Sequence, residues 1–493
     1  MPVRTGKEYI DGLKTRSPEV WIGGERVADV TSHPALRPSM EQIAHLFDMQ
    51  HDPVHAEALT YISPTTGDRV GASFMPAADR AGLEKRRECY RLWAEATLGM
   101  MGRSPDFMNV VLLSFAEGRE VFARGGERFA ENIVRYYEYV RENDLFLTHA
   151  LVQPPTDRSK ASADQAEEFL HVGNVRETSD GIVIRGARML ATLGPVADEV
   201  LVYNLPLLQP QDTKHALAFS LPIDAPGLRQ ICREPFDAGG RSAFDHPLGV
   251  NFEEPDSMMI FEDVLVPWDR VYVHDDVEIS NAVFPDTNLR NYTAHQTAVR
   301  GLVKLQLAVG VAIAVSRAAK ADQFLHVRHM LGECLNYVEI VRSCILCSEL
   351  ECEPTSVGTV RPHFEPLQVV RTMLPQWYPR VIEVMQTIGG GGLLAMPSAA
   401  DFSSTIASDI EKYYQGADGR PTAERIKLYR LAWDLCGDAF GMRQLQYERY
   451  YAGDPYRSMA MNYFTFDSHA CDDLVARALD LADCIESDRD AAE

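Results

Sequence analysis

Two segments of the chain combine residue types that could bind an anion. Arg103 comes just before the expected start of a helix, where free backbone N–H groups add partial positive charge. His149 precedes a Pro-Pro turn that ends at Arg158. Taken alone, Arg103 could be an ordinary surface arginine and His149 a structural histidine, so neither assigns a function by itself.

Three further segments could contact a planar or phosphorylated ligand. Thr192 ends an expected strand of small residues and could donate a hydrogen bond to a ring, or satisfy its own turn. His295 lies near the expected N-terminus of an apolar helix, which disfavours its cationic form and leaves a neutral base. Gln386 precedes the glycine run 389–392, which offers backbone N–H groups to a phosphate or simply ends a helix.

Several other kinds of site find no support in the sequence. There is no Gly-x-Gly-x-x-Gly after a strand and no Gly-x4-Gly-Lys-[Ser/Thr], so a Rossmann nicotinamide site and a P-loop are unsupported. The pairs His51/His55 and His326/His329 have helical spacing but lack a third ligand. We therefore predict no metal site.

Composition narrows the class of protein. The 493 residues include 48 Lys+Arg and 71 Asp+Glu, and the resulting net charge of −23 argues against binding to nucleic acid or to an anionic membrane. The nine cysteines are few and odd in number, and the N-terminus is polar, so we expect reduced thiols in a cytoplasmic protein. The most apolar run, 302–314, predicts a buried helix and not a membrane span.

The elements that must position these residues fall into three blocks. Residues 1–150 are predicted to form a mostly helical domain, including a helix through 110–140 that Ser104 caps. Residues 151–285 carry short apolar runs separated by turn signals, which predict a β-barrel domain. Residues 286–493 return to long helices and predict a helical bundle. The expected class is α+β, with the helical, β and four-helix-bundle order of the acyl-CoA dehydrogenases.

Several motifs occur together in a way that is specific to one family. They are RTGKEYIDGL, GRSPDF, LTHALVQPPTDR, FEDVLVPWDRVYV, QTIGGGGLLAMPS and QLQYERYYAGDP. With them the chain resembles the oxygenase components of two-component, reduced-flavin-dependent aromatic hydroxylases. This is the 4-hydroxyphenylacetate 3-monooxygenase family, which includes chlorophenol and nitrophenol monooxygenases. The resemblance runs from about residue 5 to residue 484.

The resemblance implies a monooxygenase that acts on a small phenol, either free or tethered to a carrier protein. A separate flavin reductase would supply reduced flavin, FADH2 in preference to FMN, and O2 would convert it to a C4a-hydroperoxyflavin that hydroxylates the ring. A homotetramer is also implied. The alternatives are an acyl-CoA dehydrogenase-type flavoenzyme and a non-catalytic flavin-binding scaffold. A 4-hydroxybutyryl-CoA dehydratase is disfavoured, because Leu302 replaces a cluster cysteine expected after His295.

The resemblance also suggests roles for individual residues. Arg103, His149 and His295 would be catalytic and would bind substrate, together with Phe107 and Asn204. The stretch 204–212 would cover the substrate. Phe107 replaces a tyrosine of many members, which points to an altered phenol. The residues expected to contact the flavin are His149, Pro155, Thr156, Arg158, Thr192, Gln386, Gly389, Gly390, Gly392, Tyr451, Ala452, Gly453 and Asp454.

Overall fold

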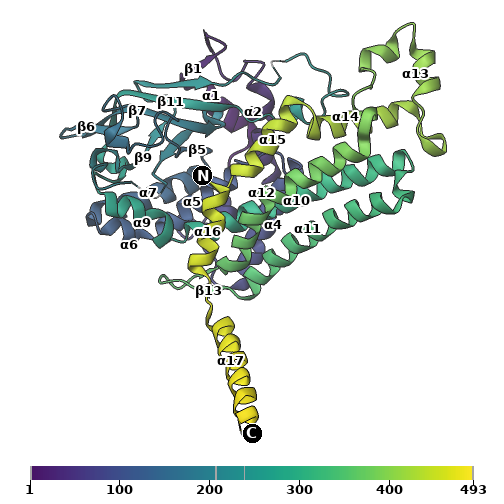
Figure 1. Cartoon of the computed structure of the whole chain (residues 1–493). Coiled ribbons are helices and arrows are strands. Elements are labelled where there is room, and N and C mark those ends of the chain that lie inside the picture. The colour runs from purple at the N-terminus through teal and green to yellow at the C-terminus, as the bar shows by residue number, and fades with distance from the viewer. Residues whose placement is uncertain (1–2, 206–207, 238, 491–493) are drawn as a thin grey trace.

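The computed structural model describes residues 3–205, 208–237 and 239–490. Along the chain a β region comes between two helical regions, and in space its sheets lie to one side of the long C-terminal helices (Figure 1). The helices of the first region are α1 (Gly6–Lys14), α2 (Arg37–Met49), α3 (Ala56–Leu59), α4 (Arg80–Ala96), α5 (Pro105–Glu117), α6 (Arg119–Ala123) and α7 (Glu127–Asn143).

The start and the course of the helix predicted through 110–140 need correction. The segment forms three helices, α5 to α7, and Gly126 lies before α7 with a φ of +134°, which an α-helix does not accept. Ser104 does not cap α5 through its side chain. Its hydroxyl donates to Asp106 Oδ1 at 2.6 Å.

Two sheets form the β region. One has six strands in the order β2-β1-β10-β11-β7-β6, and the other has four in the order β12-β9-β8-β5. Two small hairpins, β3–β4 and β13–β14, lie outside them. The strands are β1 (Glu19–Ile22), β2 (Glu25–Arg26), β3 (Thr60–Ile62), β4 (Arg69–Gly71), β5 (Leu147–Ala150), β6 (Gly173–Glu177), β7 (Gly181–Thr192), β8 (Glu199–Val202), β9 (Ala218–Pro222), β10 (Leu228–Cys232), β11 (Asp256–Pro267), β12 (Val271–Val273), β13 (Glu353–Pro354) and β14 (Val360–Arg361).

The sheets draw on more of the chain than the residues 151–285 predicted as a barrel. Strand β1 runs parallel to β10, and β5 runs parallel to β8, so both larger sheets include strands from the first 150 residues. The two longest strands, β7 and β11, pair antiparallel and bring Thr192 opposite Asp256. That pairing places the end of β7 beside the C-terminal helices.

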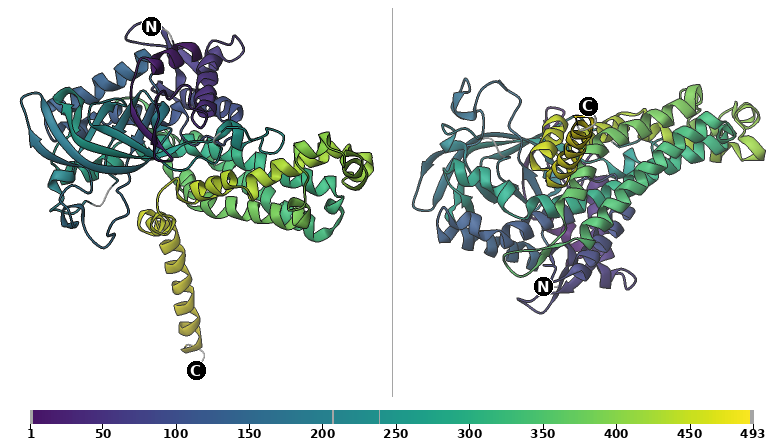
Figure 2. Two further views of the ribbon diagram at one scale, coloured as in Figure 1. Left: turned by 90° about the horizontal axis from the view of Figure 1, so that it is seen from above. Right: turned by 60° about the horizontal axis from the view of Figure 1, so that its bottom comes forward.

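The C-terminal region is a set of packed helices. Helices α10, α11 and α12 lie side by side, and α17 extends away from the body of the molecule (Figures 1 and 2). The helices from the β region onward are α8 (Gly249–Phe252), α9 (Val277–Asp286), α10 (Leu289–Ala318), α11 (Leu325–Leu350), α12 (Phe364–Gly389), α13 (Ala407–Tyr413), α14 (Thr422–Cys436), α15 (Ala439–Tyr450), α16 (Pro455–Thr465) and α17 (His469–Asp490). Helix α12 ends in the glycine run, as the sequence predicted.

Helix α10 contains the most apolar run of the sequence and lies in the bundle core. It is long and apolar enough to cross a membrane, but 61% of its most apolar 18-residue window is buried inside the protein. Its buried face meets α12, α4, α5 and α14. The packing matches the buried helix that the sequence predicted over 302–314.

Buried charges hold α15 between the β region and α10. On one side Arg443 donates to Glu254 Oε2 at 2.6 Å and to Asp256 Oδ1 at 2.9 Å. On the other side Glu448 accepts from Arg300 and from Lys304 Nζ, the latter at 2.8 Å. Burial by itself raises the pKa of Glu448, but the two cations outweigh it and lower that pKa to about 2.

We predict that Glu448→Gln lowers the free energy of unfolding by about 3–5 kcal/mol, because Arg300 and Lys304 are left buried without a counter-charge. Equilibrium unfolding in denaturant measures the loss. The pKa of Glu448 is depressed from 4.5 to about 2, so its stabilisation is present above pH 4.5 and is lost as the pH falls towards 2.

The control is Asp11→Asn, which removes exposed ion pairs with Lys7 and Lys14 and should leave the free energy of unfolding nearly unchanged. If Glu448→Gln lowers the free energy of unfolding no more than the control does, the buried ion pairs of Glu448 do not hold α15 in place.

Candidate active site

Arg103 and His149 come together although 46 residues separate them. Arg103 Nε donates to His149 Nε2 at 2.9 Å. Arg103 lies in the loop before α5, and His149 lies in β5. The ring of Phe107 packs on both, with its centroid 4.1 Å from Arg103 Cζ and 5.5 Å from the imidazole centroid. The structure therefore groups three of the residues selected from the sequence.

Tyr447, on α15, completes this cluster and was missed by the sequence analysis. Its hydroxyl accepts a hydrogen bond from Arg103 Nη1 and donates to the carbonyl oxygen of Gly102 at 3.2 Å. A Cβ at Gly102 would lie 2.3 Å from the Tyr447 hydroxyl oxygen, so only glycine fits there. The available signals were the glycine of GRSPDF and the tyrosine of QLQYERYYAGDP, but nothing in the sequence indicated that the two meet.

The cluster carries a positive charge, and the described residues leave the Nδ1 of His149 without a hydrogen-bond partner. The Arg103 guanidinium donates only to uncharged groups: the His149 ring, the Gly102 carbonyl and the Tyr447 hydroxyl. Burial, and then the charge of Arg103, lower the pKa of His149 well below its ordinary 6.5. Because an arginine nitrogen can only donate, His149 Nε2 is the acceptor and the neutral ring carries its proton on Nδ1. That Nδ1 is buried without a partner in the described structure, so the cluster suits an oxyanion.

His295 lies in a different cluster. Its Nε2 bonds to Glu349 Oε1 at 2.7 Å, and its ring packs edge-on to Tyr90 with centroids 5.7 Å apart. Burial lowers the pKa of His295, and the helix end has little part in this because α10 already begins at Leu289. The structure does not bring His295 to Arg103 and His149, and its role as a second base stays a prediction.

Thr192 can accept a hydrogen bond from a ligand but cannot donate one. Its hydroxyl already donates to Asp256 Oδ1 at 2.8 Å. Burial by itself raises the pKa of Asp256, but Arg443 outweighs it and lowers that pKa to about 2, so the carboxylate is ionised and accepts only. This corrects the expectation that Thr192 donates to a ring.

A cavity of about 570 Å³ lies between the loop after β5 and the loop after β8. Pro155, Thr156, Arg158 and Asn204 line it, as expected for ligand contacts. The side chain of Asn204 already forms hydrogen bonds within the protein: its amide nitrogen donates to the His215 carbonyl oxygen and to Ser280 Oγ, both at 3.0 Å. The stretch 204–212 was predicted to cover the substrate, and its positions 206 and 207 lie outside the described residues.

The remaining predicted flavin contacts do not line this cavity. Gln386 Nε2 donates to the Cys436 carbonyl oxygen at 2.6 Å, and Gly390 and Gly391 face open space. Gly389 is buried beneath the run, and Gly392 lies against the Tyr429 ring.

The loop 451–454 lies at the end of α15. The Tyr451 ring stacks on Tyr447 at a centroid distance of 6.2 Å. The Ala452 carbonyl oxygen accepts from Arg371 Nη2 at 3.2 Å, Gly453 has a φ of +98°, and Asp454 caps α16. The cluster and this loop are thus joined through Tyr447.

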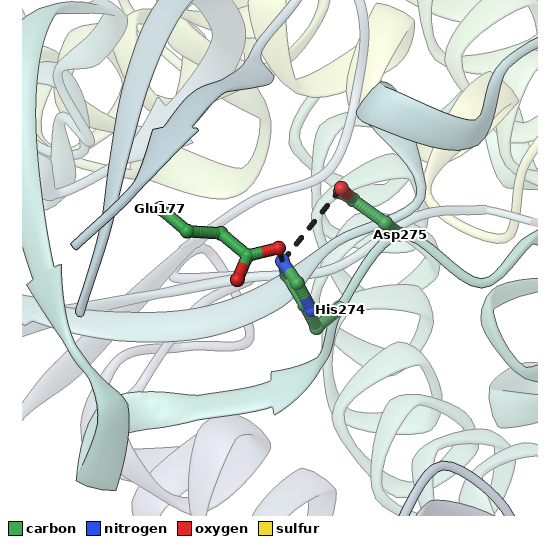
Figure 3. A group of neighbouring side chains, drawn as sticks. All are labelled: Glu177, His274 and Asp275. Carbon is green, nitrogen blue, oxygen red and sulfur yellow. Dashed lines mark ion pairs between the residues drawn. The ribbon is translucent and has the colours of Figure 1, made fainter. Parts of the chain in front are cut away.

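Three groups of histidine and carboxylate side chains lie close enough together to hold an ion among the described residues. One consists of Glu177, His274 and Asp275, and Figure 3 shows the His274 ring between the two carboxylates. His274 Nε2 lies 3.5 Å from Glu177 Oε1 and 3.6 Å from Asp275 Oδ2. The amide nitrogen of Asn174 lies 3.2 Å from His274 Nε2 and donates to Asp275 Oδ2 at 2.9 Å, so these side chains already have partners and we assign the group no metal.

Family models match nearly the whole chain. The model described as 4-hydroxyphenylacetate 3-hydroxylase N terminal matches residues 5–273, and its C-terminal counterpart matches residues 280–480. The 4-hydroxyphenylacetate 3-monooxygenase oxygenase component of Thermus thermophilus is 42% identical over 94% of this chain and 95% of its own length. The 4-nitrophenol 2-monooxygenase oxygenase component of a Rhodococcus species is 31% identical over 91% of this chain and 86% of its own length.

Solved structures share the fold. One is the oxygenase component of 4-hydroxyphenylacetate 3-monooxygenase complexed with FAD and 4-hydroxyphenylacetate, which is 40% identical, has a TM-score of 0.93, and covers 98% of this chain and 99% of its own. A 4-hydroxybutyryl-CoA dehydratase from N. maritimus has a TM-score of 0.87 at 20% identity, over 97% of this chain and 95% of its own, and shows the fold alone. The predicted family and fold class are confirmed.

We predict that His149 stays neutral throughout the range from pH 5 to 8, since burial and Arg103 both disfavour its charged form. Replacing Arg103 by Met removes the nearby positive charge, so the pKa of His149 should rise while burial still keeps it below 6.5. Histidine-selective carbon-13 NMR follows the titration, and His149→Gln assigns the signal.

The matched control is Arg185→Met, which removes an exposed arginine that pairs with Asp263. A His149 signal that titrates near pH 6.5 in the wild type, or that does not respond to Arg103→Met, would contradict the cluster.

Proposed function

The chain belongs to the 4-hydroxyphenylacetate 3-hydroxylase family and is a flavin-dependent monooxygenase of a phenol, and we propose that Arg103 and His149 hold the oxygen of that phenol. The observation that carries the proposal is the bond from Arg103 Nε to His149 Nε2, in a cluster whose guanidinium donates to no carboxylate. A bound phenolate supplies the missing negative charge.

The charge of Arg103 favours the ionised form of the phenol. A guanidinium within hydrogen-bond reach lowers the pKa of a phenol from its usual value of about 10, and the buried ring of Phe107 keeps the local dielectric low. Ionisation raises the electron density at the ring carbons next to the phenol oxygen, which are the carbons that a hydroxylation attacks. His149 donates its Nδ1 proton to the phenolate oxygen, and Tyr447 holds Arg103 in place.

The described residues fit a reduced flavin. Thr192 can only accept a hydrogen bond, as the N–H of a reduced flavin ring requires. The cavity lined by Pro155, Thr156 and Arg158 has a volume typical of small-molecule sites. The similar structure solved with FAD supports FAD as the flavin that these residues hold. When bound, the reduced flavin supplies the activation of O2 and the oxygen atom that is transferred.

We also propose the partners that the resemblance implies. Exposed apolar side chains on α16 and α17, including Tyr463, Phe464, Leu474 and Leu481, support assembly with copies of the same chain as a homotetramer. Light scattering should then give a mass near four times the 55.1 kDa of one chain. A mass of one chain would refute the assembly.

A separate flavin reductase would supply the reduced flavin. Hydroxylation should therefore proceed with reduced FAD alone and should fail with NADH and oxidised FAD until a reductase is added. The cysteines whose side chains the structure describes are all free, which supports a cytoplasmic enzyme, and cell fractionation would test this.

The proposed reaction can be tested with reduced FAD and oxygen-18 gas. The full-length protein, mixed with a set of 4-substituted phenols, should yield a hydroxylated phenol that contains one oxygen-18 atom, as detected by mass spectrometry. Thr192→Val should lower the yield per reduced FAD about tenfold or more, because the acceptor for the ring N–H is lost. Thr15→Val, at an exposed hydroxyl, is the matched control and should leave the yield unchanged. Reoxidation of the flavin with no hydroxylated product from any phenol would contradict the proposal.

A further inference from the structure

His246 faces two buried carboxylates at a point where three segments of the chain meet. His246 lies in the loop between β10 and β11, just before α8, whereas Asp434 lies on α14 and Asp438 caps the start of α15. His246 Nδ1 lies 2.9 Å from Asp438 Oδ2 and 3.7 Å from Asp434 Oδ1, and all three atoms lie within 4.8 Å of one another. The group therefore joins a loop of the β region to the corner between two C-terminal helices.

The three atoms that face one another in this group form no hydrogen bond to any described residue. His246 Nδ1, Asp434 Oδ1 and Asp438 Oδ2 are all buried and all unsatisfied. The side chain of Asp434 is 0% exposed, so water from the surface does not reach its free oxygen. A buried carboxylate oxygen without a partner costs free energy. Its position here, directed at two other unsatisfied atoms, points to a ligand that all three share.

The other oxygen of each carboxylate already has a partner in the fold. Asp434 Oδ2 accepts from the backbone N–H groups of Leu248 at 2.6 Å and Gly249 at 2.9 Å. Asp438 Oδ1 accepts from the backbone N–H of Ala439 at 2.8 Å, at the start of α15. These bonds fix both carboxylates, and each is left with one oxygen for the shared ligand.

The charge of the group favours a cation. Arg241 is the cation that pairs with Asp438: its Nη2 lies 3.0 Å from Oδ2 but directs its hydrogen bond to Oδ1, at 3.3 Å. Burial raises the pKa of Asp434, and the charge of Asp438 raises it further, although two backbone N–H groups act in the opposite direction. A positive ion between the two carboxylates removes both penalties.

The geometry and the ligand types match a zinc ion. Two ligand atoms that each lie about 2.1 Å from one Zn²⁺ are about 3.0–3.6 Å apart. The two distances from His246 Nδ1, 2.9 and 3.7 Å, are close to these limits. An imidazole nitrogen suits zinc and other transition metals, whereas Mg²⁺ and Ca²⁺ prefer oxygen ligands. The side chains of His246 and Asp438 are 16% and 14% exposed, so water can complete the coordination.

We propose that His246, Asp434 and Asp438 bind one Zn²⁺ ion, which holds the loop before α8 against the start of α15. Because α15 carries Tyr447 and Arg443, the ion is a further anchor for the helix that the buried ion pairs position. The proposal departs from the sequence-based prediction that there is no metal site. Spacing could not indicate these ligands, since they come from distant parts of the chain.

The test is a zinc titration of the full-length protein after a chelator and dialysis have removed bound metal. Calorimetry should show one Zn²⁺ site per chain in the wild type. His246→Gln and Asp438→Asn should each weaken this site at least about tenfold, since even the loss of a residue that only supports a ligand weakens metal binding by that much. Asparagine can still cap α15. Zn²⁺ should raise the melting temperature of the wild type but not of the variants, and Mg²⁺ should raise neither.

The matched control is His274→Gln, which removes the histidine of the group with Glu177 and Asp275, whose side chains already have partners. It should leave the zinc affinity unchanged. Substitution with Co²⁺ separates the site from the free cysteines, because a site of one nitrogen and two carboxylates lacks the near-ultraviolet band of a thiolate ligand.

Two results would overturn the zinc site. One is a wild type that binds no Zn²⁺, or binds Co²⁺ only with the thiolate band. The other is an affinity that neither His246→Gln nor Asp438→Asn lowers. In either case the group is an ion pair of a protonated His246 with the two carboxylates. If His246→Gln does not fold, the affinity of Asp438→Asn decides.

Discussion

The buried charges on α15 determine where the three regions of the chain meet. Arg443 faces the carboxylates of the β region, and Glu448 faces the cations of α10. A charge that is buried without its partner costs several kcal/mol, so only one placement of α15 satisfies both sides. That placement brings Tyr447 to Arg103. The same network includes Asp256, which orients the Thr192 hydroxyl, so it positions both the candidate phenol site and the candidate flavin contact.

Four arginines of the interior differ in the groups to which they donate. Arg300 and Arg443 are matched by carboxylates and hold helices together. The guanidinium groups of Arg103 and Arg188 donate to carbonyl, amide, hydroxyl or imidazole groups, and they lie at the cluster and at the cavity. Positive charge that the fold leaves unmatched is charge available to a ligand. Among these four, the arginines paired with carboxylates stabilise the fold, and the other two lie where we expect ligands.

The sequence predicted what local patterns and family motifs encode. The order of helical and β regions, the end of α12 at its glycines, and the importance of Arg103 and His149 could all be read from it. It could not predict features that depend on long-range placement. Tyr447 reaches Arg103 only because α15 is held on both sides, and Thr192 is an acceptor only because β7 pairs with β11 at Asp256.

The same limit explains why the surroundings of His295 could not be predicted. A neutral histidine in an apolar helix was predictable, but the facing carboxylate of Glu349, 54 residues away, was not. The contribution of β1 to the central sheet was missed for a similar reason. A four-residue strand in a mostly helical region has no local signal that distinguishes it from a loop until β10 pairs with it.

If the Arg103 cluster binds the phenol oxygen in its ionised form, the pKa of a bound phenol depends on Arg103. The ultraviolet difference spectrum of a bound phenol, recorded as the pH is raised for the wild type and for Arg103→Met, measures this dependence. We expect the bound phenol to ionise at least one pH unit below its usual pKa of about 10 in the wild type, and near or above 10 in the variant, where burial without the cation disfavours the anion. A bound phenol that ionises at the same pH in both proteins would show that Arg103 does not stabilise the phenolate.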